Sequence, residues 1–423
     1  MNMKKNFHLT LLFAFCLNFG NAFAQNIRCK LEGKIIGRDS KYLILLKATE
    51  DPRFAGIKIP IEKNVFSFEL EVPFVEKYKL IFGDEYEDGG YKQIAFFAEN
   101  YSVNFVLHSL EDFDKNTITG SVLTQKMKDF EQQVRSKFYV QYKPFQAILD
   151  SLEESNNYWS ENAKQLQAQL RNKPTENERY KLLAALEELS VSGEMWTPIA
   201  LIQMHKRDSI SKIRLDWQYE YIQRNPDVFS YSLLWKLFDD ISSGDKNINL
   251  AALIEMYQKF SKLYPTHPYT NTIAEMLNAI QTIKVGNHFL DFSAPTIEGE
   301  VIKISEQIKG KVALIDMWAS WCGPCRGLSK SIIPIYEKYK DKGFTIVGIA
   351  REFKTTNQFK TAVKNDKYPW LNLIELDDKN GIWNKYNINK GGGNTYLVDS
   401  NGVILAIHPK AEELEKILGS MLK

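Results

Sequence analysis

The hydrophobic pattern divides the chain into parts with different periodicities. Between residues 26 and 120, short apolar runs such as Tyr42-Leu43-Ile44-Leu45-Leu46 partly alternate with polar positions, and glycines separate them. This spacing predicts short strands packed as a small sandwich or barrel. Between residues 121 and 285, Gly and Pro become scarce, and apolar residues recur at helical spacing, for example over 182–189. We therefore expect an all-β N-terminal domain followed by an α-helical segment.

The last part of the chain, residues 286–423, alternates between strand and helix patterns. The almost continuous apolar run over 312–318 is typical of a strand buried on both faces. A helix pattern follows from Pro324 to about Lys340. The later patterns predict a strand over 344–349, a helix over 356–363, a hairpin of strands over 396–398 and 403–407, and a last helix over 412–422. This order predicts an α/β domain with a mixed sheet flanked by helices.

The first 24 residues have the pattern of a cleavable signal peptide. Lys4 and Lys5 precede an apolar stretch over 9–19, and Ala22-Phe23-Ala24 places small residues before a cleavage site at Gln25. The apolar stretch is too short for a hydrocarbon core of about 30 Å. We expect a soluble protein exported to the periplasm, where disulfides form, with peripheral membrane contact or none.

Composition agrees with a folded, multi-domain chain. Its 423 residues are 44% hydrophobic and 25% charged, which are ordinary globular values. The formal charge is +2, and removal of residues 1–24 leaves 52 basic and 52 acidic residues. A neutral chain gives no electrostatic reason to expect a nucleic-acid partner.

The cysteines carry the candidate chemistry. Loss of the signal peptide removes Cys16 and leaves Cys29, Cys322 and Cys325. Cys322 falls at the start of a helix, where free backbone N–H groups and the helix dipole favour a thiolate, the attacking species in disulfide exchange. Cys325 lies almost one turn further on, close enough to attack a mixed disulfide. Pro324 between them is tolerated because the first helical turn lacks internal N–H bonds.

The pair has two other interpretations, a zinc site or a structural bridge, and Cys29 also has two. A tetrahedral zinc site needs four ligands, but the chain has no second CxxC motif and its six histidines are scattered, so we expect no metal and no cofactor. A purely structural bridge rarely closes so small a loop at the start of a helix. Cys29 is either a partner in an intermolecular disulfide or redox reaction, or a buried thiol, and we favour the buried thiol.

The segment from about residue 286 to 423 resembles the thioredoxin superfamily, specifically the exported TlpA/ResA-like thiol-disulfide oxidoreductases. The resemblance covers about a third of the chain and rests on the WCGPC motif at 321–325, with supporting matches at 291–295, 310–312, 396–399 and 402. The part that ends near Thr119-Gly120-Ser121 resembles the β-rich domain that precedes such modules in Bacteroidota proteins.

The resemblance implies a role for each motif residue. Cys322 is then the nucleophile and Cys325 the resolving thiol of a redox-active disulfide. Asp316 matches the buried acid of the family, and an acid inside an apolar strand should have a raised pKa. It can then accept and return the proton of Cys325. Trp318 and Trp321 are expected to pack around the pair, with Trp321 shaping the substrate surface beside Gly323 and Pro324.

Two positions depart from the family pattern. Thioredoxin-like folds place a cis-proline opposite the cysteine pair, and here that position is Gly393. Because a non-proline cis bond costs about 2.5–4 kcal/mol, we expect a trans or mobile loop, with Gly392 and Gly393 bordering the substrate groove. Leu328 replaces an acid that ResA-like proteins carry, which leaves Asp316 as the only expected proton-handling acid.

These observations lead to three functional hypotheses. The first is an exported reductase of protein disulfides, for which the resemblance implies a membrane thiol donor of the DsbD/CcdA type; a disulfide oxidant or isomerase is its variant. The second, a thiol peroxidase, is disfavoured because Ile315 and Ala319 occupy the Pro and Thr positions of the peroxiredoxin loop. The third is a partner-binding or scaffold protein in which residues 26–285 hold a partner and the redox module is an accessory. We prefer to combine the first and third.

Overall fold

The computed structural model describes residues 26–422, apart from 54–55, 100, 173, 243–244, 246 and 389–390. The predicted signal peptide lies outside the described residues. Along the described parts of the chain, no helix is both long and apolar enough to cross a membrane.

The N-terminal part is a sandwich of two four-stranded sheets, as predicted. One sheet has the order β4-β1-β7-β8 and the other β3-β2-β5-β6. Alternate residues of both sheets, such as Leu31 and Leu45, share one core with Phe96 and Phe105. The strands are β1 (Ile27–Ile36), β2 (Tyr42–Lys47), β3 (Ile57–Pro60), β4 (Val65–Val72), β5 (Glu76–Phe82), β6 (Ile94–Ala98), β7 (Ser102–His108) and β8 (Thr117–Thr119), with a short helix α1 (Gly83–Asp88) after β5.

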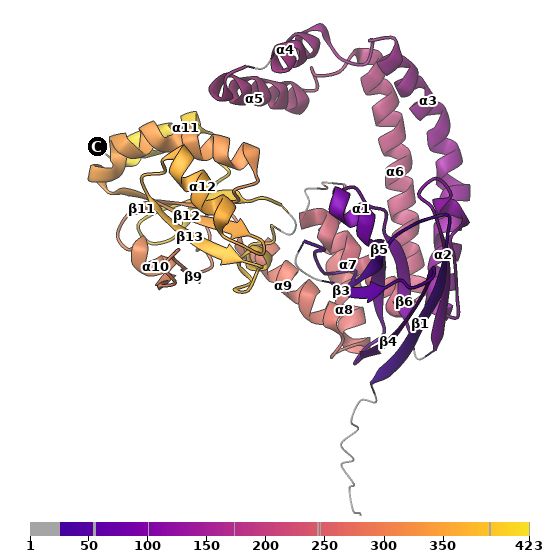
Figure 1. Ribbon diagram of the computed structural model, residues 1–423. Helices are drawn as coiled ribbons and strands as arrows, with labels where there is room; N and C mark the ends of the chain where they lie inside the picture. The colour runs from indigo at the N-terminus through magenta and orange to yellow at the C-terminus, as the bar shows by residue number, and fades with distance from the viewer. Residues whose placement is uncertain are drawn as a thin grey trace, which may run out of the picture.

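The middle of the chain is helical, as its apolar spacing predicts. Side chains cap several of the helices; Thr175, for example, forms a capping box with Glu178 at the start of α5. The helices are α2 (Val122–Val134), a π-helical turn (Arg135–Tyr139), α3 (Val140–Glu154), α4 (Glu161–Arg171), α5 (Glu176–Ser192), α6 (Pro198–Arg224), α7 (Val228–Ser242), α8 (Leu250–Leu263) and α9 (Pro268–Thr282). Helices α3 and α6 pack together as a long arm, and the α4–α5 hairpin at its end turns back to contact α11 of the C-terminal part (Figure 1).

The C-terminal part is an α/β domain around a mixed sheet of order β13-β12-β11-β14-β15. Strands β11, β12 and β13 are parallel, and β14 and β15 form the predicted hairpin. Apolar clusters cover both faces of the sheet. The elements are β9 (Ser293–Pro295), β10 (Val301–Lys303), α10 (Ile304–Gln307), β11 (Val312–Trp318), α11 (Gly323–Tyr339), β12 (Phe344–Glu352), α12 (Asn357–Asp366), β13 (Leu371–Leu376), α13 (Ile382–Lys385), β14 (Asn394–Val398), β15 (Ile404–Ile407) and α14 (Ala411–Met421).

Strand β13 and the β9–β10 hairpin were not predicted from the sequence. In β13 the polar residues Asn372 and Glu375 interrupt the apolar run. Both find partners in the fold: Asn372 accepts a hydrogen bond from the Trp318 indole, and Glu375 accepts one from the Asn380 backbone N–H. One partner is distant in the sequence and the other lies in the turn after the strand, so the pattern within β13 does not reveal the strand.

Candidate active site

Strand β11 and helix α11 position the cysteine pair. All seven residues of β11 are buried, so the strand is fixed at the centre of the sheet and delivers the loop 319–321 to its edge. Cys322 is the N-cap of α11, and its Sγ accepts a hydrogen bond of 3.3 Å from the Cys325 backbone N–H. Cys322 and Cys325 form a disulfide, with their Cα atoms 5.3 Å apart. Both side chains are half-buried, so the bond lies at the surface of the domain.

Asp316 is buried in β11, as predicted, with 2% of its surface exposed. Burial raises its pKa to about 7, although a hydrogen bond from the Ser329 hydroxyl acts in the lowering direction. Ser329 Oγ lies 2.7 Å from Asp316 Oδ2 and 3.0 Å from the Cys325 carbonyl oxygen. Ser329 therefore joins the acid to the helical turn of the second cysteine. Sequence reasoning missed Ser329, although its position one turn after Cys325 is a signal that could have found it.

A second buried acid, Glu352, lies near the loop and was not anticipated from the sequence. Glu352, at the end of β12, is 2% exposed, and its two carboxylate oxygens accept hydrogen bonds from the Ser320 backbone N–H (2.9 Å) and hydroxyl (2.7 Å). Burial raises the pKa of Glu352 against the lowering effect of these bonds. The carboxylate holds the loop that leads into Cys322.

The two tryptophans of the motif have different environments. Trp318 is fully buried, lies edge-on to Tyr368 with ring centres 5.1 Å apart, and donates its indole N–H to Asn372 Oδ1. It belongs to the core of the domain. Trp321, next to the first cysteine, is 40% exposed and stacks on Phe353 with ring centres 5.9 Å apart. Gly323 and Pro324 lie exposed in the first turn of α11.

The glycine run before β14 packs directly on the disulfide. A Cβ atom at Gly392 would lie only 2.6 Å from Cys322 Sγ and 3.2 Å from Cys325 Sγ. At Gly393 a Cβ would lie 1.7 Å from the Met317 carbonyl oxygen. Gly392, rather than Gly393, therefore faces the sulfur atoms, which corrects the expectation for Gly393. The described backbone contains no cis peptide bond, so Gly393 is trans, the first of the two states we expected.

The N-terminal part reaches the exposed side of the site. The Arg53 guanidinium lies 4.9 Å from the centre of the Trp321 ring and 4.5 Å from that of Phe353. Both carboxylate oxygens of Asp51 accept hydrogen bonds from Arg53 Nε at 3.0 Å, which fixes the guanidinium over the rings. With α5 lying against α11 and α9 against α13, the first two-thirds of the chain contacts the redox domain at several separate places.

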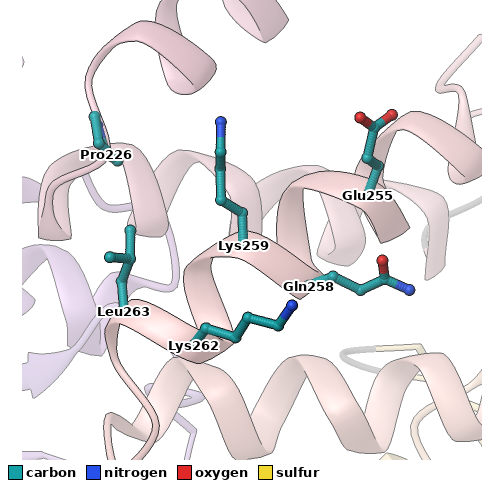
Figure 2. A pocket seen from close by; sticks show the side chains of 6 residues that line it. All are labelled: Pro226, Glu255, Gln258, Lys259, Lys262 and Leu263. Atoms are coloured by element: carbon teal, nitrogen blue, oxygen red, sulfur yellow. The ribbon is translucent and has the colours of Figure 1, made fainter.

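One pocket adjoins the cysteine loop, and another lies away from it. The first has a volume of about 340 Å³ and is lined by Ser320 together with Arg326 and the polar residues Asn357, Gln358, Thr361 and Asn365. The other, of about 450 Å³, lies on α8 and has no residue of the cysteine site in its lining (Figure 2). Of these two pockets, the one beside Ser320 is placed to contribute to chemistry at the disulfide.

Cys29 lies fully buried in the core of the β-sandwich, in agreement with the favoured interpretation. Burial raises the pKa of its thiol to about 11, which keeps it protonated and unreactive at neutral pH. Among the described residues, no group of three or more His, Cys, Asp and Glu side chains is arranged to hold a metal ion.

Comparison with known proteins finds relatives for the N-terminal and the C-terminal part of the chain. Residues 285–407 match the AhpC/TSA family and residues 29–127 match a domain of unknown function, DUF4369. The thioredoxin-like protein YneN of Bacillus subtilis is 34% identical over 128 residues, which cover 30% of this chain and 72% of that protein. The thiol-disulfide oxidoreductase ResA of Bacillus cereus is 25% identical over 145 residues, covering 34% of this chain and 75% of ResA. Among solved structures, the thioredoxin domain of a thiol-disulfide oxidoreductase from Bacteroides vulgatus matches with a TM-score of 0.31 and 26% identity, covering 34% of this chain and all of that one.

Proposed function

The chain belongs to the family of thioredoxin-like thiol-disulfide oxidoreductases, and on that premise we propose that it reduces disulfide bonds of exported proteins outside the cytoplasm. The observation that carries the proposal is the half-exposed disulfide Cys322–Cys325 at the N-terminus of α11, with the buried acid Asp316 joined through Ser329 to the turn that carries Cys325. The signal-peptide pattern of residues 1–24 supports export, with the periplasm as the destination.

The reaction begins with both cysteines reduced. The Cys322 thiolate, stabilised at the helix N-terminus, attacks one sulfur of the substrate disulfide, and the other substrate sulfur leaves as a thiolate that takes up a proton. Cys325 then loses its proton and attacks Cys322 Sγ. The second substrate sulfur leaves as a thiolate and is protonated in turn. The substrate has gained two electrons, and the enzyme is left with the Cys322–Cys325 disulfide.

Asp316 is suited to the second attack. A carboxyl group with a pKa of about 7 is present in both protonation states near neutral pH. It can therefore accept the proton of Cys325 as that thiol attacks, and return it when the enzyme is reduced again. Reduction of the enzyme needs an external thiol donor, and we propose a membrane protein of the DsbD/CcdA type, as the family resemblance implies.

We further propose that the N-terminal region selects the substrates. Trp321 precedes the nucleophile in the chain and its indole is exposed, so we expect protein substrates of Cys322 to contact it. Arg53 of the β-rich domain covers part of that ring, and α5 lies against α11. A substrate that docks at the disulfide then meets surfaces from both parts of the chain.

Reduction of a disulfide-bonded protein such as insulin, with dithiothreitol as the electron source, tests the proposal. Cys322→Ser should abolish turnover, and Cys325→Ser should accumulate a mixed disulfide with the substrate that separates from the enzyme on reducing gels. A Cys322→Ser variant as active as the wild type would refute the function. The direction follows from the midpoint potential of the pair: a value near about −270 mV fits a reductant, and one of about −180 to −120 mV fits an oxidant or isomerase.

Thiol peroxidase is the second candidate, because the matching family model is AhpC/TSA. Ala319 and Ile315 occupy the loop positions where a peroxidatic site of that kind has Thr and Pro, and neither side chain can hydrogen-bond a peroxide. We therefore expect no peroxide-dependent consumption of thiols above the rate of Cys322→Ser. Turnover of hydrogen peroxide well above that rate would favour the peroxidase instead.

A further inference from the structure

The segment that faces the disulfide consists of glycines and has no side chain of its own to hold it in place. Gly392 packs against Cys322 so closely that even a methyl group would lie 2.6 Å from its sulfur. Glycine loses more conformational freedom on ordering than any other residue. The run Gly391–Gly393 therefore needs an anchor from elsewhere in the fold if it is to keep one position against the sulfur atoms.

The structure provides such an anchor in Arg351, near the end of β12. One terminal nitrogen of its guanidinium donates a hydrogen bond of 3.2 Å to the Gly391 carbonyl oxygen. Nε donates to Asp378 Oδ1 at 2.8 Å, and the other terminal nitrogen pairs with Asp378 Oδ2. The side chain is 2% exposed, so these bonds form away from bulk water, where charge-assisted bonds are strongest.

Aromatic rings fix the plane of the same guanidinium. Its central carbon lies 5.4 Å from the centre of the Phe353 ring and 5.7 Å from that of Trp383. Phe353 is also the ring that stacks on Trp321. Arg351 is thus held by a carboxylate and two rings, and one of its terminal nitrogens donates to the backbone of the glycine run.

We propose that Arg351 is a positioning residue for the redox pair: the Arg351–Asp378 pair holds the Gly391–Gly393 segment against the Cys322–Cys325 disulfide. This inference rests on the proposed function, since positioning matters only if the disulfide exchanges with a substrate. The fixed segment limits access of small thiols to the sulfur atoms and presents a protein substrate with an ordered surface. A freed segment does the opposite, because it leaves the sulfur atoms open and must be ordered each time a protein docks.

The test compares two rates in Arg351→Gln, Asp378→Asn and the wild type. One is the rate at which dithiothreitol reduces the Cys322–Cys325 disulfide, followed by tryptophan fluorescence. The other is kcat/KM for reduction of insulin. We expect the first to rise and the second to fall, each by about tenfold, as loss of one charge-assisted hydrogen bond allows. Arg38→Gln breaks a similar pairing of a guanidinium with the carboxylates of Asp84 and Glu85 in the β-sandwich. It is the matched control and should change neither the dithiothreitol rate nor kcat/KM for insulin.

Opposite changes in the two rates distinguish positioning from general destabilisation. General destabilisation lowers kcat/KM for insulin without a selective rise in the rate at which dithiothreitol reduces the disulfide. Equal dithiothreitol rates in Arg351→Gln and wild type would overturn the inference. If both variants fail to fold, hydrogen exchange on the wild-type protein decides: the Gly391 amide, which donates to the Ile388 carbonyl at 3.0 Å, should be protected. Exchange of the Gly391 amide as fast as in an unstructured peptide would also overturn the inference.

Failure of the proposed function gives a different result. A wild-type protein that reduces no protein disulfide would refute the proposed function, whereas the dithiothreitol rates and the hydrogen exchange would still test whether Arg351 holds the glycine segment.

Discussion

Asp316→Asn should make the oxidised protein more stable at alkaline pH and less active. Burial raises the pKa of Asp316 from an ordinary value of 3.8 to about 7 in the folded state. Between these two values the folded protein holds a proton that the unfolded chain has released. The free energy of unfolding of the wild type therefore falls as pH rises from about 4 to 7, and it stays lower above that range. An uncharged Asn removes this loss and can still accept the hydrogen bond from Ser329.

The magnitude follows from the difference between the two pKa values. Roughly three pH units, at about 1.4 kcal/mol each, correspond to about 4 kcal/mol. We expect Asp316→Asn and wild type to have similar stability near pH 4, and the variant to gain up to about 4 kcal/mol at pH 8. Guanidinium unfolding of the oxidised proteins measures this difference in the free energy of unfolding. The oxidised form is used because the Cys322–Cys325 disulfide does not titrate in this pH range, whereas the two free thiols of the reduced form would. Asp341→Asn, at an exposed position after α11, is the control and should stay within about 0.5 kcal/mol at every pH.

The same variant should lose about a hundredfold in reductase rate, the contribution typical of a general base. Its activity should also lose the rise with an apparent pKa of about 7 that Asp316 gives the wild type. A constant stability difference between variant and wild type across pH 4–8 would refute the reasoning, since the buried carboxyl would then not titrate as described. An unchanged rate together with the expected stability gain would place Asp316 in the fold and outside the reaction.

Three further substitutions test other contacts of the site. Gly392→Ala places a methyl group against Cys322 and should destabilise the oxidised form by about 1–3 kcal/mol in denaturant unfolding, whereas Gly90→Ala, with nothing within 4 Å, should be neutral. Ser320→Ala leaves one oxygen of the buried Glu352 carboxylate without its donor and should cost about 1–3 kcal/mol, more at pH 8 than at pH 5, because burial raises the pKa of Glu352. Arg53→Gln should weaken the contact with Trp321 by about 0.5–2 kcal/mol, raise KM for protein disulfides and change tryptophan fluorescence. Arg28→Gln, at an exposed position near the start of β1, is the control and should change none of these properties.

The elements that could be predicted are those whose sequence signal is local. The uninterrupted apolar run of β11, the CxxC pair and Pro324 together define a strand, a turn and a helix start, and the apolar neighbours of Asp316 already indicate its burial. By contrast, the sequence pattern ends the next strand at residue 349. The structure extends β12 to Glu352, because two charged residues at its end are buried with partners from distant segments.

The contacts of Arg351 and Glu352 could not be predicted from the local sequence pattern. Arg351 and Glu352 look like the polar end of a strand, yet one reaches the glycine run and the other the cysteine loop. Each side of the disulfide is thus supported by a buried charge from the neighbouring strand β12. Charges are costly to bury unless they are paired, so their presence here indicates that fixing the two loops is worth that cost. If both supports act on the same disulfide, the effects of Ser320→Ala and Arg351→Gln on the dithiothreitol rate should not be additive, which a double-mutant cycle measures directly.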